Sequence, residues 1–449
     1  MRGCNDMVFV ARQVQEKAKE QQCSLNICFF DIKKAYDTVN RDILWPLLLK
    51  CGLPLKVVTL IRKLHEGMKA VVRVKDTFTE PFDVLNGLKQ GCVLAPFLFN
   101  LFFDQVIHTA LSGYEGDVQL NYKIDGKLFR RSGCKLPLKM TITELRFADD
   151  LMATCHSQLL LQDFINRFTK AAKTWGLEVS TTKSKVMIQQ SGLPSTPASF
   201  FINDNQIEVV PHFQHLGSIL SNDATLDKEI TSRISKAASV FSTLKSQVWN
   251  NPSLSQSTRL AVYQAAVLPA LLYGAETWTT TERHLDRLEC FNMDSIRQAM
   301  GVSKLAHIPN ITLRAKAKIP RIATLIKICR LRWLGHVWRM PDVRLPKQVL
   351  FGELNNGKRP QHKPKVRWRD CITKDIKDVK LSSTWPNLTM NREKWRTEVK
   401  QRCAEYNSKL DEDDKKRRAI HKDDGYEDEG LLFSLLLFAF NCGVASLSA

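Results

Sequence analysis

The chain has 449 residues, of which 44% are hydrophobic. This length exceeds one ordinary domain and predicts two or three domains with substantial cores. The formal net charge is +20, because 66 Lys and Arg stand against 46 Asp and Glu. Residues 301–400 alone hold 24 basic and 7 acidic residues. Such an excess favours a polyanionic partner and argues against a small neutral molecule as the main ligand.

The cysteines and the two ends of the chain bear on its compartment. Twelve cysteines are scattered without the paired spacing of a zinc finger, which predicts free thiols in a reducing compartment. The first residues lack the apolar core of a signal peptide, so we expect an intracellular protein of the nucleus, the cytoplasm or both, and not a secreted one. Residues 431–447 are 17 mostly apolar residues, just short of a membrane span. A weak tail anchor and an extension without a packing role both stay open, with the membrane as the less favoured partner.

The first hundred residues alternate predicted strands and helices. Residues 24–31 are predicted to form a strand, whose apolar stripe of Leu25, Ile27 and Phe29 ends at Asp31. A loop and a helix follow, and the helix stops before Gly52 and Pro54. The next elements expected are two strands joined by a polar turn within 70–87, a glycine-rich loop at 87–91 and an apolar helix from Pro96 to about residue 108.

Strands return at 118–148, with a hairpin turn expected at Asp125 and Gly126. Strong strand formers flank Asp149 and Asp150, so a hairpin with arms 144–148 and 151–155 is expected to carry these two residues at its bend. An amphipathic helix is expected at 157–175. The stretch 191–199 is the clearest break in composition, and a mainly helical region is predicted beyond it.

The adjacent Asp149 and Asp150 have two interpretations when taken alone. Aspartate is common in turns, so a surface bend explains them without any chemistry. A third isolated carboxylate, Asp31, also ends a strand, and the three would meet at one rim if both strands lie centrally in one antiparallel sheet. Two carboxylates about 4 Å apart repel each other by ~4 kcal/mol, and divalent cations with a preference for oxygen ligands relieve that repulsion. Two such ions would suit an in-line phosphoryl displacement.

Five segments in order carry a resemblance to a known family: "FFDIKKAYDTV", "NGLKQGCVLAPFLFN", "LRFADDLMAT", "GLEVSTTKSKVM" and "FQHLGSIL". Their order and approximate spacing resemble motifs A to E of reverse transcriptases. Their wording is similar to that of the non-LTR (LINE-type) retrotransposon enzymes, nearest to the RTE group. Later stretches, "LLYGAETW", "LRWLGHVWRM" and "GKRPQHKPKVRWRD", are similar to the segments downstream of the polymerase core in those elements. The resemblance runs from about residue 2 to about residue 400.

The resemblance implies an α+β fold built around a polymerase palm, in which helices back an antiparallel sheet. Incomplete fingers, a helical thumb and a basic helical C-terminal region complete it. The divisions expected are a palm with a remnant of the fingers at 1–190, motif E and the thumb at 200–300, a basic nucleic-acid-binding region at 301–410, and a disordered charged tract with an apolar tail at 411–449. Because the match starts abruptly, we expect an N-terminally truncated member, without the upstream fingers that help to position the nucleotide and without the endonuclease.

The resemblance also assigns the catalytic carboxylates. Asp31, Asp149 and Asp150 are implied as the metal-binding residues, with two Mg²⁺ ions as cofactors and Mn²⁺ as the alternative. Asp37 is expected to be structural.

Four further residues are implied to bind the nucleotide. Tyr36 would lie under the incoming sugar, and Gln90 and Gly91 would form a loop against the nucleotide and template. Lys183 would offset charge on the triphosphate. The competing interpretations are a core aromatic for Tyr36, an ordinary glycine turn for the loop and a solvated surface residue for Lys183.

The basic region alternates arginines with tryptophans, a composition suited to single-stranded nucleic acid. The residues expected to bind nucleic acid are Arg330, Arg332, Arg339, Lys358, Arg359, Lys363, Lys365, Arg367 and Arg369. Trp333, Trp338 and Trp368 would add stacking. Trp333 also falls on an apolar helical face, so a core role and a stacking role both stay open for it.

The expected function is that of an RNA-directed DNA polymerase core, which extends a DNA primer by two-metal nucleotidyl transfer. The expected partners are an RNA template, a DNA primer and dNTPs, with no obligate protein partner evident. The alternative is a retroelement-derived nucleic-acid-binding protein without turnover. The missing fingers count against the first hypothesis, and the three intact aspartates count against the second.

Overall fold

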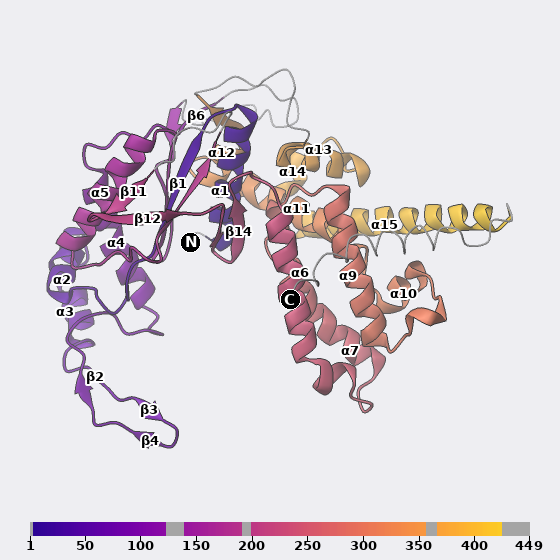
Figure 1. Ribbon diagram of the computed structural model, residues 1–449, viewed down its shortest axis with the longest axis horizontal. Helices are drawn as coiled ribbons and strands as arrows, with labels where there is room; N and C mark the ends of the chain where they lie inside the picture. The colour runs from indigo at the N-terminus through magenta and orange to yellow at the C-terminus, as the bar shows by residue number, and fades with distance from the viewer. Residues whose placement is uncertain (1–2, 123–138, 191–198, 356–365, 424–449) are drawn as a thin grey trace, which may run out of the picture.

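The computed structural model describes residues 3–122, 139–190, 199–355 and 366–423. A six-stranded sheet with helices around it forms the N-terminal half, and a mainly helical region follows (Figure 1). This mixed arrangement is the α+β class expected from the sequence.

The central sheet holds its most buried strand in the middle. Its strands, in spatial order, are β11 (Phe200–Ile202), β12 (Asn205–Val209), β10 (Lys185–Gln189), β1 (Leu25–Phe30), β9 (Asp150–Cys155) and β8 (Glu144–Phe147). Among the pairs of neighbouring strands described in this sheet, β10 and β12 are parallel and the other four pairs are antiparallel. All six residues of β1 are buried, because both faces of the sheet are covered.

Helices cover one face of this sheet. They are α2 (Arg41–Lys50), α3 (Leu55–Lys63), α4 (Ala95–Leu111) and α5 (Gln158–Thr174). Cys28 and Phe30 of β1 enter this core beside the phenylalanines of α4 and α5. Between α3 and α4, two short ribbons form an exposed arm that leaves the body of the molecule (Figure 1). The arm consists of β2 (Lys69–Ala70) paired with β5 (Phe82–Asp83) and β3 (Arg73–Val74) paired with β4 (Thr77–Phe78).

The opposite face is covered by segments from distant parts of the chain. They are α1 (Cys4–Glu20), the hairpin β13 (His212–His215) and β14 (Ser218–Ser221), α12 (Leu345–Phe351), and a small sheet of β15 (Gly352–Leu354), β6 (Gln119–Tyr122) and β7 (Lys139–Thr141). Ile27 and Phe29 of β1 enter this second core. Helix α1 lies at its centre and is buried on most of its circumference.

Several sequence predictions for this half are confirmed. The strand at 24–31, the helix before Gly52, the apolar helix ending near 108 and the amphipathic helix at 157–175 correspond to β1, α2, α4 and α5. The hairpin around Asp149 corresponds to β8 and β9, but only Asp149 lies in the bend, because Asp150 pairs with Phe147 as the first residue of β9. The turn expected at Asp125 and Gly126 lies outside the described residues, as does the break in composition except for its last residue.

The region beyond the sheet is mainly helical, as predicted. Its helices are α6 (Asp227–Thr243), α7 (Gln256–Val262), α8 (Leu268–Leu271), α9 (Glu282–Met300), α10 (Asn310–Ala317) and α11 (Ile322–Arg339). Shorter turns of helix are η1 (Lys245–Trp249), η2 (Tyr263–Val267), η3 (Ala275–Thr277) and η4 (Lys304–Ala306). Ile230, Phe241, Tyr263 and Ile296 lie in the core that joins these helices.

The C-terminal helices enclose a core rich in tryptophan. They are α13 (Trp368–Asp378), α14 (Trp385–Thr389) and α15 (Arg392–Asp423). Trp333, Trp338 and Trp368 are all buried in this core together with Trp385 and Trp395. The stacking role expected for the first three is therefore wrong for this structure, because their rings pack on other side chains and leave no open face for a base.

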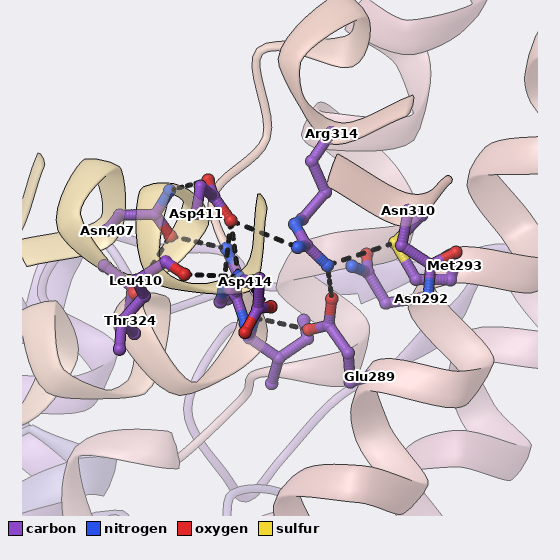
Figure 2. A network of polar contacts seen from close by, with 12 residues as sticks. Glu289, Asn292, Met293, Asn310, Arg314, Thr324, Asn407, Leu410, Asp411 and Asp414 are labelled. Carbon is purple, nitrogen blue, oxygen red and sulfur yellow. Dashed lines mark hydrogen bonds and ion pairs between the residues drawn. The ribbon is translucent and has the colours of Figure 1, made fainter. Parts of the chain in front are cut away.

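The expectation of disorder at 411–429 is also wrong for residues 411–423, because α15 continues through them. Figure 2 shows Asp411 of α15 turned toward Arg314 of α10. Nη2 of Arg321 lies 2.6 Å from Asp411 Oδ1 and 2.7 Å from Asp414 Oδ2, and Arg314 joins Asp411 to Glu289. The acidic residues at this end of α15 are neutralised by tertiary contacts that the local sequence does not show. Residues 424–429 lie outside the described ranges.

None of the helices in the described ranges is long and apolar enough to cross a membrane. The apolar stretch at 431–447 lies outside those ranges.

Gly335 lets α11 and α15 approach closely, which gives a first prediction. A Cβ at this position would collide with the indole of Trp395, which is 2% exposed and donates its Nε1–H to the Leu331 carbonyl at 3.0 Å. Overpacking costs roughly 1–3 kcal/mol, and alanine gains ~1 kcal/mol in helix propensity, so a net loss of up to about 2 kcal/mol remains. Because the clash involves a buried indole, we expect Gly335→Ala to lower the free energy of unfolding by about 1–2 kcal/mol, measured by urea denaturation followed by circular dichroism.

The control for this prediction is the same substitution in a Trp395→Phe background. Phenylalanine lacks the five-membered ring that the new methyl group would strike, so the loss should be smaller there. Equal losses in the two backgrounds would contradict the proposed collision.

Candidate active site

The candidate site lies where β1 and β9 reach the same edge of the sheet. Phe30, the last residue of β1, is opposite Leu151 of β9. Asp31 follows Phe30 and Asp150 precedes Leu151, so both carboxylates come directly after this last pair, at the same edge. Ala148 and Asp149 form the two-residue turn that joins β8 to β9, and Asp150 is the first residue of β9. The structure thus brings the three predicted carboxylates to one rim.

The electrostatics of the rim are unfavourable for three ionised carboxylates. The pKa of Asp150 is raised, first by burial and then by the negative charges of Asp149 and Asp31. The three groups therefore lie within reach of one another's charge, and a cation between them would lower the free energy of the ionised state. In the described ranges, no group of three or more His, Cys, Asp or Glu side chains is arranged to hold a metal ion.

The turn that carries Asp149 has a strained backbone. Ala148, the first turn residue, has a φ of 53°, in the left-handed region. Hairpins of this type usually place glycine there, because a Cβ in this conformation costs about 1–2 kcal/mol. Strain of this kind is frequent at functional sites, where it fixes the direction of a neighbouring side chain.

Two serines, Ser180 and Ser184, form hydrogen bonds with the backbone of Asp31, and the sequence does not predict these contacts. The Asp31 N–H donates to Ser184 Oγ at 3.2 Å, and the Ser180 N–H donates to the Asp31 carbonyl at 2.8 Å. Both serines are buried. Serine is common in loops, so no local signal marks these two residues. Lys183 lies between them, with Nζ 3.8 Å from Asp31 Oδ2 and 74% of its side chain exposed.

Tyr36 lies between the carboxylates and the helical core. Its ring stacks on Phe99 with 4.4 Å between the ring centroids, and it is partly exposed. Burial, and then the charge of Asp149, raise the pKa of its hydroxyl. The residue therefore contacts the core on one side and reaches toward the rim on the other, which leaves both sequence interpretations compatible with its position.

The loop at 87–91 is fixed against Asp37. Gln90 is exposed, and its Nε2 donates to Asp37 Oδ1 at 3.1 Å. Gly87 has a φ of +83°, and a Cβ there would lie 2.5 Å from the Asp37 carbonyl oxygen. Gly91 has a φ of +79°, a conformation that glycine adopts without strain.

The structure separates the predicted nucleic-acid-binding residues into two groups. Arg332 is exposed and Arg339 is partly exposed, so both reach the surface. Arg330 is 6% exposed and its guanidinium pairs with Asp375 at 2.7 Å, with further bonds to Trp278 and Thr280. The expectation for Arg330 is therefore corrected: the buried pairing makes it a structural residue.

Arg367 is also engaged within the protein, because it pairs with Glu20 at 3.1 Å and with Asp370 at 3.0 Å. Arg369 is partly exposed and has a partner of its own. The remaining predicted residues, Lys358, Arg359, Lys363 and Lys365, lie outside the described ranges.

Comparison with known families places this site in context. Residues 1–220 match the model of the family described as reverse transcriptase (RNA-dependent DNA polymerase). Residues 1–220 are a reverse transcriptase domain. The matched region contains β1, the β8–β9 hairpin and the segment with Ser180 and Lys183, so the whole candidate rim belongs to the reverse transcriptase domain.

The relatives of this chain are distant in sequence. A transposon-derived protein of Caenorhabditis elegans is 25% identical, over 57% of this chain and 94% of that protein. An RNA-directed DNA polymerase of the transposon X-element of Drosophila melanogaster is 24% identical, over 78% of this chain and 35% of that protein. The RNA-directed DNA polymerase of the mobile element jockey of Drosophila funebris is 24% identical, over 69% of this chain and 32% of that protein. The chain thus spans about a third of the length of these two polymerases.

Among solved structures, a telomerase of Candida tropicalis in complex with a fragment of telomeric RNA covers 77% of this chain and 52% of that chain. The identity is 14% and the TM-score is 0.32, a likeness too loose to support an argument about the reverse transcriptase domain.

The strained turn gives a prediction for Ala148→Gly. Glycine removes the cost of the left-handed conformation, about 1–2 kcal/mol, but adds about 0.5–1 kcal/mol of unfolded-state entropy. We expect the free energy of unfolding to rise by up to about 1 kcal/mol, measured by urea denaturation. The control is Ala153→Gly in β9, where φ is not positive and the same change should destabilise. A loss of stability in both variants would contradict strain at the turn.

The raised pKa of Asp150 gives a prediction of pH dependence. A carboxyl group whose pKa is higher in the folded state than in the unfolded state ionises less readily in the folded protein. Its ionisation therefore lowers the free energy of unfolding, and this loss grows as the pH rises from the ordinary pKa of 3.8 through the folded-state pKa. We expect Asp150→Asn to gain stability relative to the parent as the pH rises from about 3 to about 7, with a small gain because solvent screens the exposed side chain. Urea denaturation across this range measures it. Asp286→Asn, an exposed change on α9, serves as the control, and a difference for Asp150→Asn that is constant with pH would contradict the prediction.

Proposed function

We propose that this chain is the RNA-directed DNA polymerase core of a non-LTR retrotransposon and extends a DNA primer on an RNA template. The observation that carries the proposal is the meeting of Asp31, at the end of β1, with Asp149 and Asp150 of the β8–β9 hairpin at one edge of the sheet, where the charges of Asp149 and Asp31 act on Asp150, in a region that matches the reverse transcriptase family. The printed names of the relatives, which are RNA-directed DNA polymerases of mobile elements, support the class of template and product.

Asp31, Asp149 and Asp150 are the residues that would hold divalent ions. Carboxylate oxygens are the ligands that Mg²⁺ prefers, and Mn²⁺ accepts them too. The pKa of Asp150 is raised mainly by burial and further by the charges of Asp149 and Asp31, and cations would relieve this second contribution, which fits the donor set. The side chains would have to turn toward one another to share the ions. When bound, two ions supply stabilisation of the charge on the attacking and leaving oxygens.

The reaction that this site would support is nucleotidyl transfer. The 3′-hydroxyl of the primer loses its proton to solvent and attacks the α-phosphorus of the incoming dNTP. The bond between that phosphorus and the bridging oxygen breaks, and pyrophosphate leaves. The strained turn at Ala148 and the serines behind Asp31 hold the carboxylates in place during this exchange.

The nucleotide would be held by the residues around the rim. Tyr36, supported from behind by Phe99, would lie under the sugar. Gln90 and Gly91 would contact the nucleotide and template. The ion pair of Lys183 with Asp31 is exposed and long, at 3.8 Å, so it contributes little and Lys183 can move to a triphosphate at low cost.

The template and primer would continue over the other parts of the chain. We place the palm at 1–190, motif E and the thumb at 200–300 and the basic region at 301–410. Arg332 and Arg339, whose side chains reach the surface, would contact the nucleic acid, because cations along its path bind the phosphates of a polyanion. Lys358, Arg359, Lys363, Lys365 and Arg369 stay contacts predicted from the sequence.

The test of the proposed function is incorporation of labelled dNTPs on a primed RNA template with Mg²⁺. Asp149→Asn removes one charged ligand, and we expect extension to fall by at least about a hundredfold. Asp286→Asn on α9 is the matched control and should extend primers like the parent.

A second readout does not depend on turnover. Mg²⁺ should raise the Tm of the parent and should raise that of Asp149→Asn less, because a ligand that binds only the folded state stabilises it. Failure of the parent to extend any primer, with RNA binding retained by parent and variant alike, would overturn the polymerase proposal. It would favour the alternative, a nucleic-acid-binding protein without turnover.

A further inference from the structure

A pocket of about 520 Å³ lies between α11, α15 and η3, outside the reverse transcriptase domain and its carboxylate rim. Four arginines line it. Arg332 and Arg339 come from α11, and Arg392 and Arg396 come from the first turns of α15. We call this cavity the arginine pocket. Sequence reasoning singled out the two residues of α11 but not the two of α15, because the crossing of the two helices is what brings them together.

The guanidinium groups of the arginine pocket are not neutralised. Within the described residues, Arg332, Arg392 and Arg396 form no side-chain hydrogen bond or ion pair, although Arg332 acts on Glu276 at longer range. Arg339 donates to the Thr389 carbonyl at 2.7 Å, and its pKa is lowered by burial and then by Arg392. The pocket therefore gathers like charges that repel one another, a cost that a bound anion would relieve.

The other titratable residues of the pocket do not balance this charge. Glu276 is the carboxylate in its lining, and that group already accepts a hydrogen bond from Asn5, while burial raises its pKa. His336 is turned to Asp6, with 3.5 Å between Nε2 and Oδ1. Four guanidinium groups thus face a single carboxylate.

A second pocket shows that this excess is not general. It measures about 720 Å³ and lies between α9, α11, α13 and α15. Its arginines and Lys327 are each paired with acidic residues, as with Arg330 and Asp375 at 2.7 Å and Arg314 and Glu289 at 3.0 Å (Figure 2 shows the latter pair). The basic side chains of the second pocket thus each have an acidic partner within the fold. The arginines of the arginine pocket lack such acidic partners among the described residues.

The chemistry of the lining selects the ligand class. A guanidinium presents a planar fork of N–H donors that matches the oxygens of a phosphate, and it stays charged at any physiological pH. Trp333 and Trp395 line the pocket but are 9% and 2% exposed, so neither offers a face for stacking a base. The features that remain recognise phosphate and not the base.

We propose that the arginine pocket binds backbone phosphates of nucleic acid, at a second site apart from the carboxylate rim. The proposal rests on the proposed function only in taking nucleic acid as the ligand. Contacts to phosphate fix position without reading sequence, so this site would anchor the strand in the same way for RNA and DNA of any sequence. Trp395, locked against Gly335, holds α15 so that Arg392 and Arg396 stay on the pocket wall.

The test is equilibrium binding of a short fluorescein-labelled single-stranded RNA to the full chain at several salt concentrations, without dNTPs. We expect R392A/R396A to weaken binding about tenfold or more and to lower the slope of log K against log salt by about 1–2. The matched control is K394A/K409A, which removes two charges from exposed positions of α15 outside the lining. It should change the affinity much less.

Each outcome bears on one of the two proposals. Tight binding by the parent and equal binding by R392A/R396A would overturn the pocket proposal while leaving the polymerase proposal untouched. Equal losses in the two double variants would also overturn it, because the effect would then be one of total charge. A rise in Tm with inorganic phosphate that R392A/R396A abolishes, with RNA affinity unchanged, would assign the pocket to a free phosphate and overturn the backbone as its source. Failure to extend primers, with the expected loss of binding, would leave the pocket standing and remove only the polymerase.

Discussion

The burial of charged residues on helix α1 is the interaction on which the rest of this structure depends. Arg12 donates to the Ile219 carbonyl at 3.0 Å, and its guanidinium lies 3.9 Å from the carboxylate of Glu229. Glu16 accepts the backbone N–H of Trp368 at 2.8 Å. Glu20 forms an ion pair with Arg367 at 3.1 Å. Burial raises the pKa of Glu16 to about 7, a sign of how little water reaches it. An unpaired buried charge costs several kcal/mol, so α1 is stable in its place only when the β13–β14 hairpin, α6 and the start of α13 all supply their partners.

The same physics separates what could be predicted from sequence and what could not. Periodic apolar residues depend on their nearest neighbours along the chain, so β1, α5 and the β8–β9 hairpin followed from local pattern. Arg330 forms an ion pair with Asp375, and no residue near Arg330 in the sequence predicts this pair. A charged residue in sequence is therefore ambiguous between a solvated group and one half of a buried pair. The charges of residues 411–423 predict disorder for this reason, whereas tertiary ion pairs hold these residues in a helix. The tryptophans of the basic region predict stacking surfaces, whereas they are buried, because aromatic rings are common in cores and in binding surfaces alike.

The candidate site was predictable to the extent that its residues are chemically unusual. Two adjacent carboxylates beside a third one carry an electrostatic cost, and the raised pKa of Asp150, due to burial and then to the charges of Asp149 and Asp31, shows this cost in the fold. The left-handed conformation of Ala148 adds a cost in backbone strain. The supporting serines at 180 and 184 have no such signature. Functional residues can be predicted from sequence where they break the rules of a stable fold, whereas the residues that position them follow those rules and give no such signal.

The pairing of β15 with β6 has a consequence for how the chain reaches its native state during synthesis. Residues 352–354 complete the small sheet of β15, β6 and β7, and α12 packs on α1 just before them. A nascent chain that has emerged only through the 220 residues of the family match would present one edge of β6 unpaired and the apolar face of α1 uncovered. Such surfaces invite association between chains. The end of the family match at residue 220 therefore falls inside a set of contacts that residues 345–354 complete, so the core around α1 closes only after those residues have been synthesised.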